Sequence, residues 1–525
     1  MILTSEQKNL GNVNFLNALG AVRREFLKGS LEAPRTGPYY FGYGMPPKEP
    51  VRAGIVGTGN EGCDAMIRQS SPDYLRFTAY FDIRPTQRKR ARAQFEKLYG
   101  KTEGAKVKES ASWREMLDDK SIEAIVIATP LWTHASLAIE ALNAGKHVLC
   151  EKLMARNVAD AKAMVRVADE KKKTLSVGHQ RHYSTLYDNV LAVVKSGVLG
   201  DIKHIKALWH RNNTWEYPVD QLNPTSPLVK DPTIPRRKVG DKEYVLNDGW
   251  FPAIPEDDQS IDYKAFGYDS LEQLIRWRVY RKTGGGLMAE LGSHQLDACS
   301  LFLNKVHPVA VSAYGGHQYF KQKYNDGREA HDHVYCTFEM PGDVTLTYTS
   351  INTNSIQGYG EIVYGTKGTL AVINERDVFL FREAGPNDDK PAREQAVATK
   401  KDASGKWNLE KVAAANLTPD GILADAAVGR ASWFVPGGES EPFSNRGYHE
   451  ELEAFADAIR NPGKKVRCDG RVALADTVMA LVANVAMEGR QHERIEFKPA
   501  WYEPAELAVP DGAPAGAATP LSARG

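Results

Sequence analysis

The feature that most constrains this chain is a glycine-rich turn that directly follows a short apolar segment. Residues 52–62 read Arg-Ala-Gly-Ile-Val-Gly-Thr-Gly-Asn-Glu-Gly, which contains the pattern G-x-G-x-x-G. Glycine lets the backbone turn tightly, approach a phosphate closely and pack the following helix against the strand. The free N–H groups at the start of that helix attract the charge of a pyrophosphate. We therefore predict a dinucleotide-binding loop made of Gly57, Gly59, Asn60, Glu61 and Gly62.

A carboxylate further along the chain strengthens this prediction. Residues 77–81 read as a second strand, and Asp82 ends it about twenty residues beyond the last glycine, where a ribose-binding carboxylate belongs. Asp82 should accept hydrogen bonds from a ribose 2′-hydroxyl and repel a 2′-phosphate, which favours NAD. Arg84 could instead accommodate that phosphate, or it could be one of several solvent-exposed cations in 84–92. We expect NAD rather than NADP.

Composition excludes several other classes of function. The chain has 525 residues, enough for two domains with extensions. Its formal charge of +1 gives no electrostatic reason to expect nucleic acid or an anionic membrane as a partner. Five scattered cysteines without C-x-x-C spacing fit a reduced compartment and argue against a disulfide framework and a zinc site. We expect no metal, and no apolar run approaches the length that spans a bilayer.

The N-terminal residues contain a motif that resembles an export signal. Residues 23–28, Arg-Arg-Glu-Phe-Leu-Lys, resemble the twin-arginine motif, but a polar stretch follows where a signal peptide needs an apolar segment. We interpret residues 1–50 as a structural arm and expect a cytoplasmic protein.

From residue 51 to 178, apolar strands alternate with amphipathic helices, which predicts a parallel sheet with crossover helices. Strands are expected at 122–128 and 147–150, and helices at 133–144 and 157–173. We therefore assign residues 51–178 to a Rossmann domain within an α/β fold.

Beyond residue 178 the pattern changes, and we assign 179–500 to a second α/β domain. A helix (186–196) and a strand (202–210) precede about seventy residues, 211–282, that are dense in Pro, Asp, Trp and Tyr. Such a long insertion is usually a functional lid or binding loop, or disordered, and its aromatics argue against disorder. These aromatics, Trp215, Tyr217, Trp250, Tyr263 and Tyr268, could stack on a sugar, or form a small core or an oligomer contact.

The rest of the second domain shows strand-like alternation followed by helical periodicity. Alternating segments at 333–339, 344–351 and 360–364 predict antiparallel strands. Two amphipathic helices are expected at 448–460 and 473–489. Residues 501–525, rich in Ala, Pro and Gly, are expected to form a loose tail.

Two polar segments could carry chemistry at the carboxyl ends of strands. In 284–297, Glu290, His294 and Asp297 would share one face of a helix, where a carboxylate could orient the imidazole as a general base. The alternative is a helix N-terminus whose acidic residues complement the helix dipole. Lys152 could hold a reacting hydroxyl and stabilise an alkoxide, or it could be a solvated loop charge.

At this point the chain resembles a known family, the Gfo/Idh/MocA oxidoreductases. The resemblance covers 51–210 and 277–500 in the same order. It is carried by the glycine turn, by Asp82, by Thr129-Pro130-x-x-x-His134, by Glu151-Lys152, by 177–183, by GGG…H-x-x-D at 284–297 and by 365–370.

The resemblance implies an N-terminal Rossmann domain and a C-terminal α/β domain built on a large, mostly antiparallel sheet. Members are typically NAD(P)-dependent enzymes that act on sugars, cyclitols or their derivatives. They often assemble through the outer face of that sheet, so we expect a homo-oligomer, a dimer or a tetramer.

The resemblance also implies roles for individual residues. Lys152 corresponds to the family's catalytic lysine and His294 to its catalytic histidine. Glu290 stands where an Asp often lies, and Leu153 where a proline usually follows Glu-Lys. The remaining cofactor-binding residues implied are Thr129, Pro130, His134, Glu151, Gln180, Trp277 and Arg278. The substrate-binding residues implied are Lys152, His182, Glu290, His294 and Asp297.

The expected function is hydride transfer between a carbohydrate-type secondary alcohol and NAD. An NAD-retaining glycosidase or lyase, which oxidises the sugar transiently, is the alternative. The glycosidase branch of this family lacks the Glu-Lys motif, whereas Lys152 is present here, which favours net oxidation. A third possibility is a regulator that senses the dinucleotide without turnover. The presence of both Lys152 and His294 argues against it.

Overall fold

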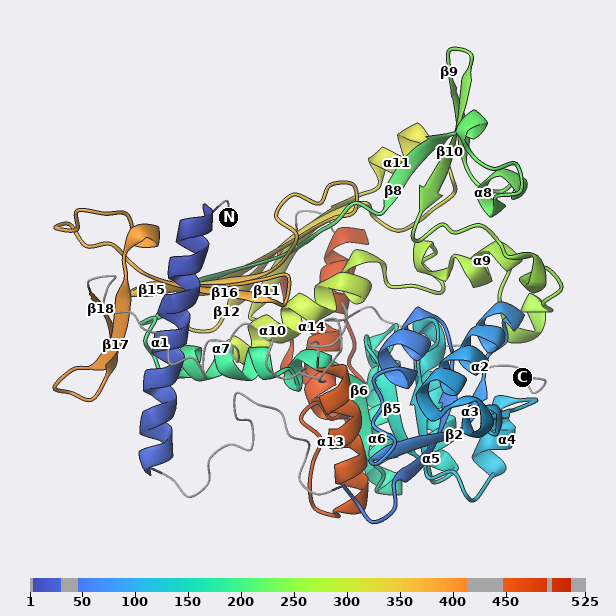
Figure 1. Ribbon diagram of the computed structural model, residues 1–525, viewed down its shortest axis with the longest axis horizontal. Helices are drawn as coiled ribbons and strands as arrows, with labels where there is room; N and C mark the ends of the chain where they lie inside the picture. Colours follow the sequence, from blue (N-terminus) through green and yellow to red (C-terminus); the bar gives the residue numbers. More distant parts are fainter. Residues whose placement is uncertain (1–2, 30–45, 413–446, 489–492, 511–525) are drawn as a thin grey trace.

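Two β-sheets organise the chain, one in each half of the molecule (Figure 1). The computed structural model describes residues 3–29, 46–412, 447–488 and 493–510. The predicted fold class, a Rossmann sheet followed by an α/β domain with a large sheet, is confirmed.

The first sheet has six parallel strands in the order β3-β2-β1-β4-β5-β6. The strands are β1 (Val51–Val56), β2 (Leu75–Phe81), β3 (Lys108–Glu109), β4 (Ala124–Ile127), β5 (His147–Glu151) and β6 (Leu175–Gly178). The strand order reverses direction between β1 and β4, and ligands bind outside the carboxyl ends of strands at such a switch point. The glycine-rich turn follows β1 there.

Helices cover this parallel sheet because each crossover must return along one of its faces. They are η1 (Glu61–Ile67, π-helical), α2 (Pro85–Tyr99), α3 (Lys101–Ala105), α4 (Trp113–Asp118), α5 (His134–Asn143) and α6 (Val158–Lys171). The Asn157 side chain caps α6, because its oxygen accepts a hydrogen bond of 2.8 Å from the Asp160 N–H.

The second sheet has eight strands in the order β16-β15-β14-β7-β13-β12-β11-β19. Its strands are β7 (Ile202–His210), β11 (Ala310–Gly316), β12 (His333–Met340), β13 (Val344–Ile351), β14 (Tyr359–Gly365), β15 (Gly368–Ile373), β16 (Asp377–Arg382) and β19 (Ile495–Glu496). Only the pairing of β7 with β13 is parallel, so the sheet is mostly antiparallel, as expected.

Helices pack on one face of the large sheet and leave much of the other face exposed. The packed helices include α10 (Ser293–Phe302) and α14 (Gly470–Glu488), and α7 (Thr185–Lys195) packs against α10. Along β12, Val334, Cys336 and Phe338 are buried, whereas the intervening Tyr335 and Thr337 are exposed. Helix α13 (Tyr448–Arg460), at the predicted position, packs instead against the glycine-turn helix η1 and the parallel sheet.

Two segments outside the expected domains are docked on them. The N-terminal helix α1 (Ser5–Gly29) lies across β16 and β17 (Val397–Lys401), and β17 pairs with β18 (Trp407–Lys411) (Figure 1). The tail we expected to be loose from residue 501 is held through residue 510. The Lys162 ammonium donates hydrogen bonds to the carbonyls of Ala500, Glu506 and Ala508. Residues 511–525 lie outside the described part of the chain.

The sequence-based prediction that no apolar segment is long enough to span a bilayer is wrong for one helix. Within the described residues, α14 has 19 residues and a mean hydropathy of 1.4, which is long and apolar enough to cross a bilayer. However, 72% of this stretch is buried inside the protein, so its apolar character is explained by its place in the core.

The insertion 211–282 folds into a unit of its own. Its three antiparallel strands, in the order β8-β10-β9, are β8 (Thr214–Pro218), β9 (Arg236–Val239) and β10 (Lys242–Asp248). The short helices α8 (Pro227–Lys230) and α9 (Leu271–Ile275) accompany them. Trp250 and Tyr268 are buried, whereas Trp215 and Tyr217 are 50% and 39% exposed, so the aromatics do not act as one set.

We predict that Asn14→Ala releases α1 from the sheet. The Asn14 amide donates to the carbonyls of Leu380 (3.1 Å) and Gln395 (3.0 Å), and its oxygen accepts from the Val397 N–H (2.9 Å). Losing these buried bonds should destabilise the contact by about 2 kcal/mol. Hydrogen exchange in residues 5–22 should speed up.

The matched control is Asn12→Ala, since Asn12 makes one longer bond, 3.4 Å, to the Val378 carbonyl. If both variants exchange at the wild-type rate, the Asn14 contacts do not hold α1.

Candidate active site

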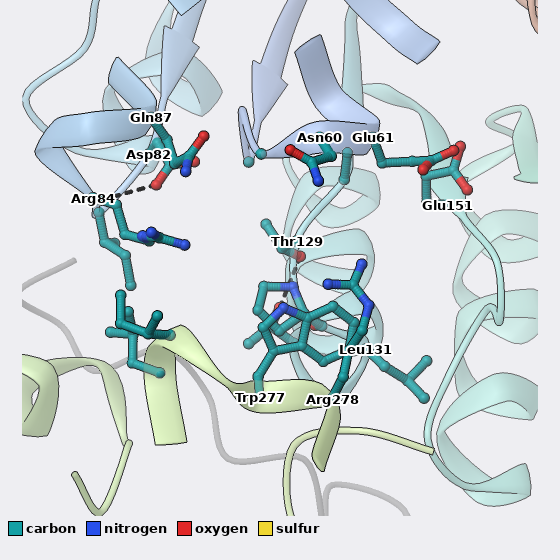
Figure 2. Close-up of a pocket in the computed structure, with 18 of the residues that line it drawn as sticks. Asn60, Glu61, Asp82, Arg84, Gln87, Thr129, Leu131, Glu151, Trp277 and Arg278 are labelled. Carbon is teal, nitrogen blue, oxygen red and sulfur yellow. Dashed lines mark hydrogen bonds between the residues drawn. The ribbon is translucent and has the colours of Figure 1, made fainter. Parts of the chain in front are cut away.

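A pocket of about 360 Å³ lies at the carboxyl ends of the parallel strands, where the insertion and the second domain close over them (Figure 2). Most of the predicted site residues line it. These are Gly57, Gly59, Asn60, Glu61, Asp82, Arg84, Thr129, Pro130, His134, Glu151, Lys152, Trp277, Arg278 and Glu290. Among the described residues, Gly62, Gln180, His182, His294 and Asp297 are not part of this lining.

The glycine turn is shaped to receive a phosphate. Gly57 has φ +87°, a left-handed conformation that favours glycine. A Cβ on Gly62 would lie 2.1 Å from the Gly57 carbonyl oxygen, so any side chain there would push the helix away. At Gly59 a Cβ would meet nothing within 4 Å, which leaves open space beside the backbone. The turn therefore fits a dinucleotide pyrophosphate.

Asp82 is held in a defined orientation at one end of the pocket. Its Oδ2 accepts a hydrogen bond of 2.7 Å from the Thr58 N–H, and its Oδ1 accepts one of 2.8 Å from the Arg84 N–H. Burial raises the pKa of this carboxyl, and the two N–H donors oppose that shift. Figure 2 shows Asp82, Arg84 and Gln87 together on one side of the pocket.

Lys152 follows β5 and reaches the second domain. Its ammonium lies 3.5 Å from the Glu290 carbonyl oxygen, in the turn that leads to His294. Its N–H donates to the Glu151 carboxylate at 3.2 Å. Burial, and next the charge of Glu61, raise the pKa of Glu151 to about 8. A protonated Glu151 beside the Lys152 backbone would add no negative charge to the pocket at neutral pH.

His134 connects the loops after β4 and β5. Its two ring nitrogens each lie 2.9 Å from a backbone carbonyl oxygen, one of Thr129 and one of Leu153. His134 thus holds the Lys152 loop against the Thr129 loop, although its ring also borders the pocket.

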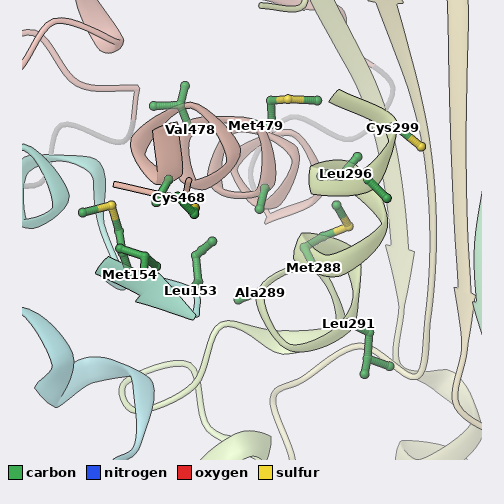
Figure 3. Close-up of a cluster of buried hydrophobic side chains, with 14 of the residues drawn as sticks. Leu153, Met154, Met288, Ala289, Leu291, Leu296, Cys299, Cys468, Val478 and Met479 are labelled. Carbon is green, nitrogen blue, oxygen red and sulfur yellow. The ribbon is translucent and has the colours of Figure 1, made fainter. Parts of the chain in front are cut away.

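Apolar packing behind the pocket fixes the Lys152 loop to the segment that carries His294. Leu153 and Met154 belong to the same buried cluster as Met288 and Leu296, together with Val478 of α14 (Figure 3). Because interiors are closely packed, a shift of either segment would disturb the other.

The carboxylates of Glu290 and Asp297, which we expected to share one helical face with His294, have separate partners in the structure. Glu290 accepts a hydrogen bond of 2.9 Å from Arg278 Nε, and Asp297 contacts His182 Nε2 at 2.6 Å. Residues Met288–Gly292 form a π-helical turn (η8) before α10. In a π-helix the spacing differs from 3.6 residues per turn, so the α-helical spacing rule does not transfer across it.

His294 itself is 7% exposed. Its ring centroid lies 5.4 Å from that of Trp209, and its carbonyl accepts a hydrogen bond of 2.7 Å from Arg181. The His294 ring is therefore packed against Trp209 of β7, and a buried cation holds the His294 backbone.

Within the described residues, one cluster has the composition of a metal site: His179, Asp297 and Asp476, whose ligand atoms lie within 4.8 Å of one another. The Lys305 ammonium lies 2.8 Å from Asp297 and 3.1 Å from Asp476. The Lys305 ammonium thus supplies one positive charge between these two carboxylates. Asp297, which we predicted to bind substrate, is buried in the interior. Its ion pair with Lys305 stabilises the buried charge.

The sequence-based prediction missed three residues that shape this site. Arg181 supports His294, Trp250 lines the pocket, and Asp258 contacts Arg84. Arg181 lies between the predicted residues Gln180 and His182, so the sequence indicates its segment but not its role. Trp250 is among the aromatics that could stack on a sugar, but the sequence does not distinguish it from the other aromatics of the insertion. Nothing in the sequence pairs Asp258 with Arg84, 174 residues away.

Two family models cover most of the chain. A model described as oxidoreductase family, NAD-binding Rossmann fold, matches residues 51–179, and one for the family's C-terminal alpha/beta domain matches 260–493. The chain belongs to the Gfo/Idh/MocA oxidoreductase family. NAD binding by the Rossmann domain is thereby supported.

Curated relatives match only part of the chain. A glycosyl hydrolase family 109 protein from Phocaeicola vulgatus is 31% identical over 171 residues, 33% of this chain and 41% of the relative. One from a Shewanella species is 26% identical over 218 residues, 40% of this chain and 48% of the relative. The chain thus spans less than half the length of these relatives.

Solved structures share the fold over most of the chain. A levoglucosan dehydrogenase in complex with NADH and levoglucosan has a TM-score of 0.56 at 14% identity, covering 85% of this chain and 99% of that one. A putative myo-inositol dehydrogenase from Sinorhizobium meliloti has a TM-score of 0.52 at 19% identity, covering 85% and 100%. At these identities the similarity shows the fold alone.

We predict that Glu151 makes stability depend on pH. Its pKa of about 8 exceeds its ordinary value of 4.5, so between these values the folded protein binds a proton that the unfolded chain has lost. This contribution to stability is present below about pH 4.5 and is lost as the pH rises through 8. Glu151→Gln should therefore gain thermal stability relative to wild type from pH 5 to pH 8.5. A difference in melting temperature that stays constant over this range would show that Glu151 ionises normally.

Proposed function

We propose that this protein is an NAD-dependent oxidoreductase that transfers a hydride between a carbohydrate-type secondary alcohol and nicotinamide. The observation that carries the proposal is the position of Lys152. Its ammonium lines the same pocket as the glycine turn and Asp82, and contacts the turn that leads to His294. A cation at this position suits a hydroxyl that becomes an alkoxide.

Each group of residues has a role that follows from its position in the pocket. The Gly57–Gly62 turn would hold the pyrophosphate of NAD, and Asp82 its ribose. NAD supplies the hydride acceptor when bound. Lys152 donates a hydrogen bond to the substrate hydroxyl and stabilises its developing negative charge. His294 accepts the hydroxyl proton, in the role that the family resemblance implies.

NAD is favoured over NADP by the electrostatics of the ribose end. The Asp82 carboxylate lines the pocket there and would repel a 2′-phosphate. Arg84, the cation that could compensate, is paired with Asp258.

A sugar, a cyclitol or a glycoside is the substrate class we propose. Structural neighbours include proteins named levoglucosan dehydrogenase and putative myo-inositol dehydrogenase. Trp250 of the insertion lines the pocket and offers an apolar surface to a pyranose ring.

A glycosidase that oxidises its sugar transiently is the second candidate. It is favoured by the relatives named as glycosyl hydrolase family 109 proteins. Lys152 in the pocket favours net oxidation instead, because the glycosidase branch lacks the Glu-Lys motif.

We further propose a cytoplasmic homo-oligomer that assembles through the outer face of the large sheet. The exposed Tyr335 and Thr337 of β12 lie on that face.

The proposed reaction predicts NADH in proportion to oxidised sugar. Purified protein with NAD and a panel of sugars, cyclitols and glycosides should raise the absorbance of reduced nicotinamide, with equimolar loss of one substrate. A glycoside cleaved without net NADH would support the second candidate. No turnover of any kind, with no binding of NADH, would refute both.

Lys152→Met should lower kcat by about a hundredfold or more, because the developing charge loses its cation. Binding of NADH, measured by fluorescence, should persist, since the glycine turn and Asp82 are unchanged. Lys171→Met, on the exposed surface of α6, is the matched control and should retain full activity. Wild-type turnover in Lys152→Met would remove this lysine from the mechanism.

A further inference from the structure

The insertion contacts the cofactor-binding domain through two consecutive aspartates. Asp257 and Asp258 lie in a short 3-10 turn, Glu256–Asp258, which packs against α2 just after Asp82. Asp257 forms an ion pair of 2.6 Å with Lys89, and both side chains are largely exposed. Asp258 contacts Arg84 and Thr86, and its side chain is 0% exposed. The two neighbouring pairs therefore differ in burial.

The carboxylate of Asp258 is held by three donors. Its Oδ1 accepts from the Thr86 N–H at 3.0 Å. Its Oδ2 accepts from the Thr86 hydroxyl at 2.6 Å and from Arg84 Nε at 2.9 Å. Removing Arg84 from this position would leave a buried carboxylate without its cation, which costs far more than breaking an exposed pair.

Arg84 is the cation whose position matters for the ribose. It lines the pocket next to Asp82, whereas the nearby Arg88 and Arg90 are not part of the described lining. Those two arginines have partners of their own. Arg88 contacts the Asp82 carbonyl and Glu109, and Arg90 contacts Asp64.

We propose that Asp258 determines coenzyme choice by withholding Arg84 from the 2′-position of the ribose. A guanidinium is the group that usually recognises a 2′-phosphate at this position of a Rossmann domain. Asp82 repels that phosphate, and Asp258 removes the cation that would offset the repulsion. The insertion thereby acts as a positioning element for cofactor selectivity. This inference rests on the proposed binding of NAD.

The test is the binding of NADH and NADPH, followed by nucleotide fluorescence and calorimetry, so that no substrate is needed. Asp258→Asn keeps an oxygen for Thr86 but removes the charge that holds Arg84. It should tighten NADPH binding by about tenfold, the gain from one charge-assisted contact, with little change for NADH. Asp257→Asn is the matched control, because it breaks the adjacent exposed pair and should leave the NADH to NADPH ratio unchanged.

A double-mutant cycle tests whether the effect passes through Arg84. Adding Arg84→Gln to Asp258→Asn should abolish the gain for NADPH. Arg84→Gln in the wild-type background should change NADPH binding by less than about twofold, because Asp258 already holds the guanidinium. This single variant keeps the inference testable if Asp258→Asn does not fold.

Three results would overturn the inference. They are an unchanged coenzyme ratio in folded Asp258→Asn, an equal shift in Asp257→Asn, and a several-fold loss of NADPH affinity in Arg84→Gln alone. Failure of the wild-type protein to bind either nucleotide would instead refute the proposed function.

Discussion

A buried arginine holds the two halves of the site in register. Arg181 is 1% exposed, yet its guanidinium contacts Glu361 of β14 at 2.7 Å, Glu375 at 2.5 Å and the His294 carbonyl at 2.7 Å. A buried guanidinium is tolerated only with such partners, because its desolvation is costly. The residue belongs to the segment that leaves the parallel sheet. One cation thus links the end of the Rossmann domain, the large sheet and the His294 helix.

The pocket depends on this link because its walls come from three units. The parallel sheet supplies the glycine turn and Lys152, the second domain supplies Glu290, and the insertion supplies Trp250. The apolar cluster around Leu153 and Met288 makes the first two move as one. The insertion is attached to the Rossmann domain through the ion pair of Asp258 and Arg84. The Asp82 end and the Lys152 end of the pocket are therefore stabilised by separate contacts.

Local patterns were sufficient to predict most of the fold. Gly57, Gly59 and Gly62 could be interpreted from sequence because each meets a backbone requirement within one turn. The alternation in 333–339 and 344–351 predicted β12 and β13, since a strand with one buried face alternates in polarity. The π-helical turn before His294 could not be predicted, because the sequence spacing of Glu290 and His294, four residues, is the same whether the backbone is α-helical or π-helical. The burial of Asp297 could not be predicted for a different reason, because its partners His182 and Lys305 come from other segments of the chain.

The sequence by itself determined the Rossmann turn, the carboxylate Asp82 that follows β2 and the presence of Lys152 and His294, because these depend on residue type at short spacing. Only the tertiary structure decided which charges are available to a ligand. Arg84 and Asp258 are 174 residues apart, and their pairing depends on how the insertion folds back onto the helix that follows Arg84. Electrostatic partners are set by distance in space and by burial, neither of which a linear pattern records.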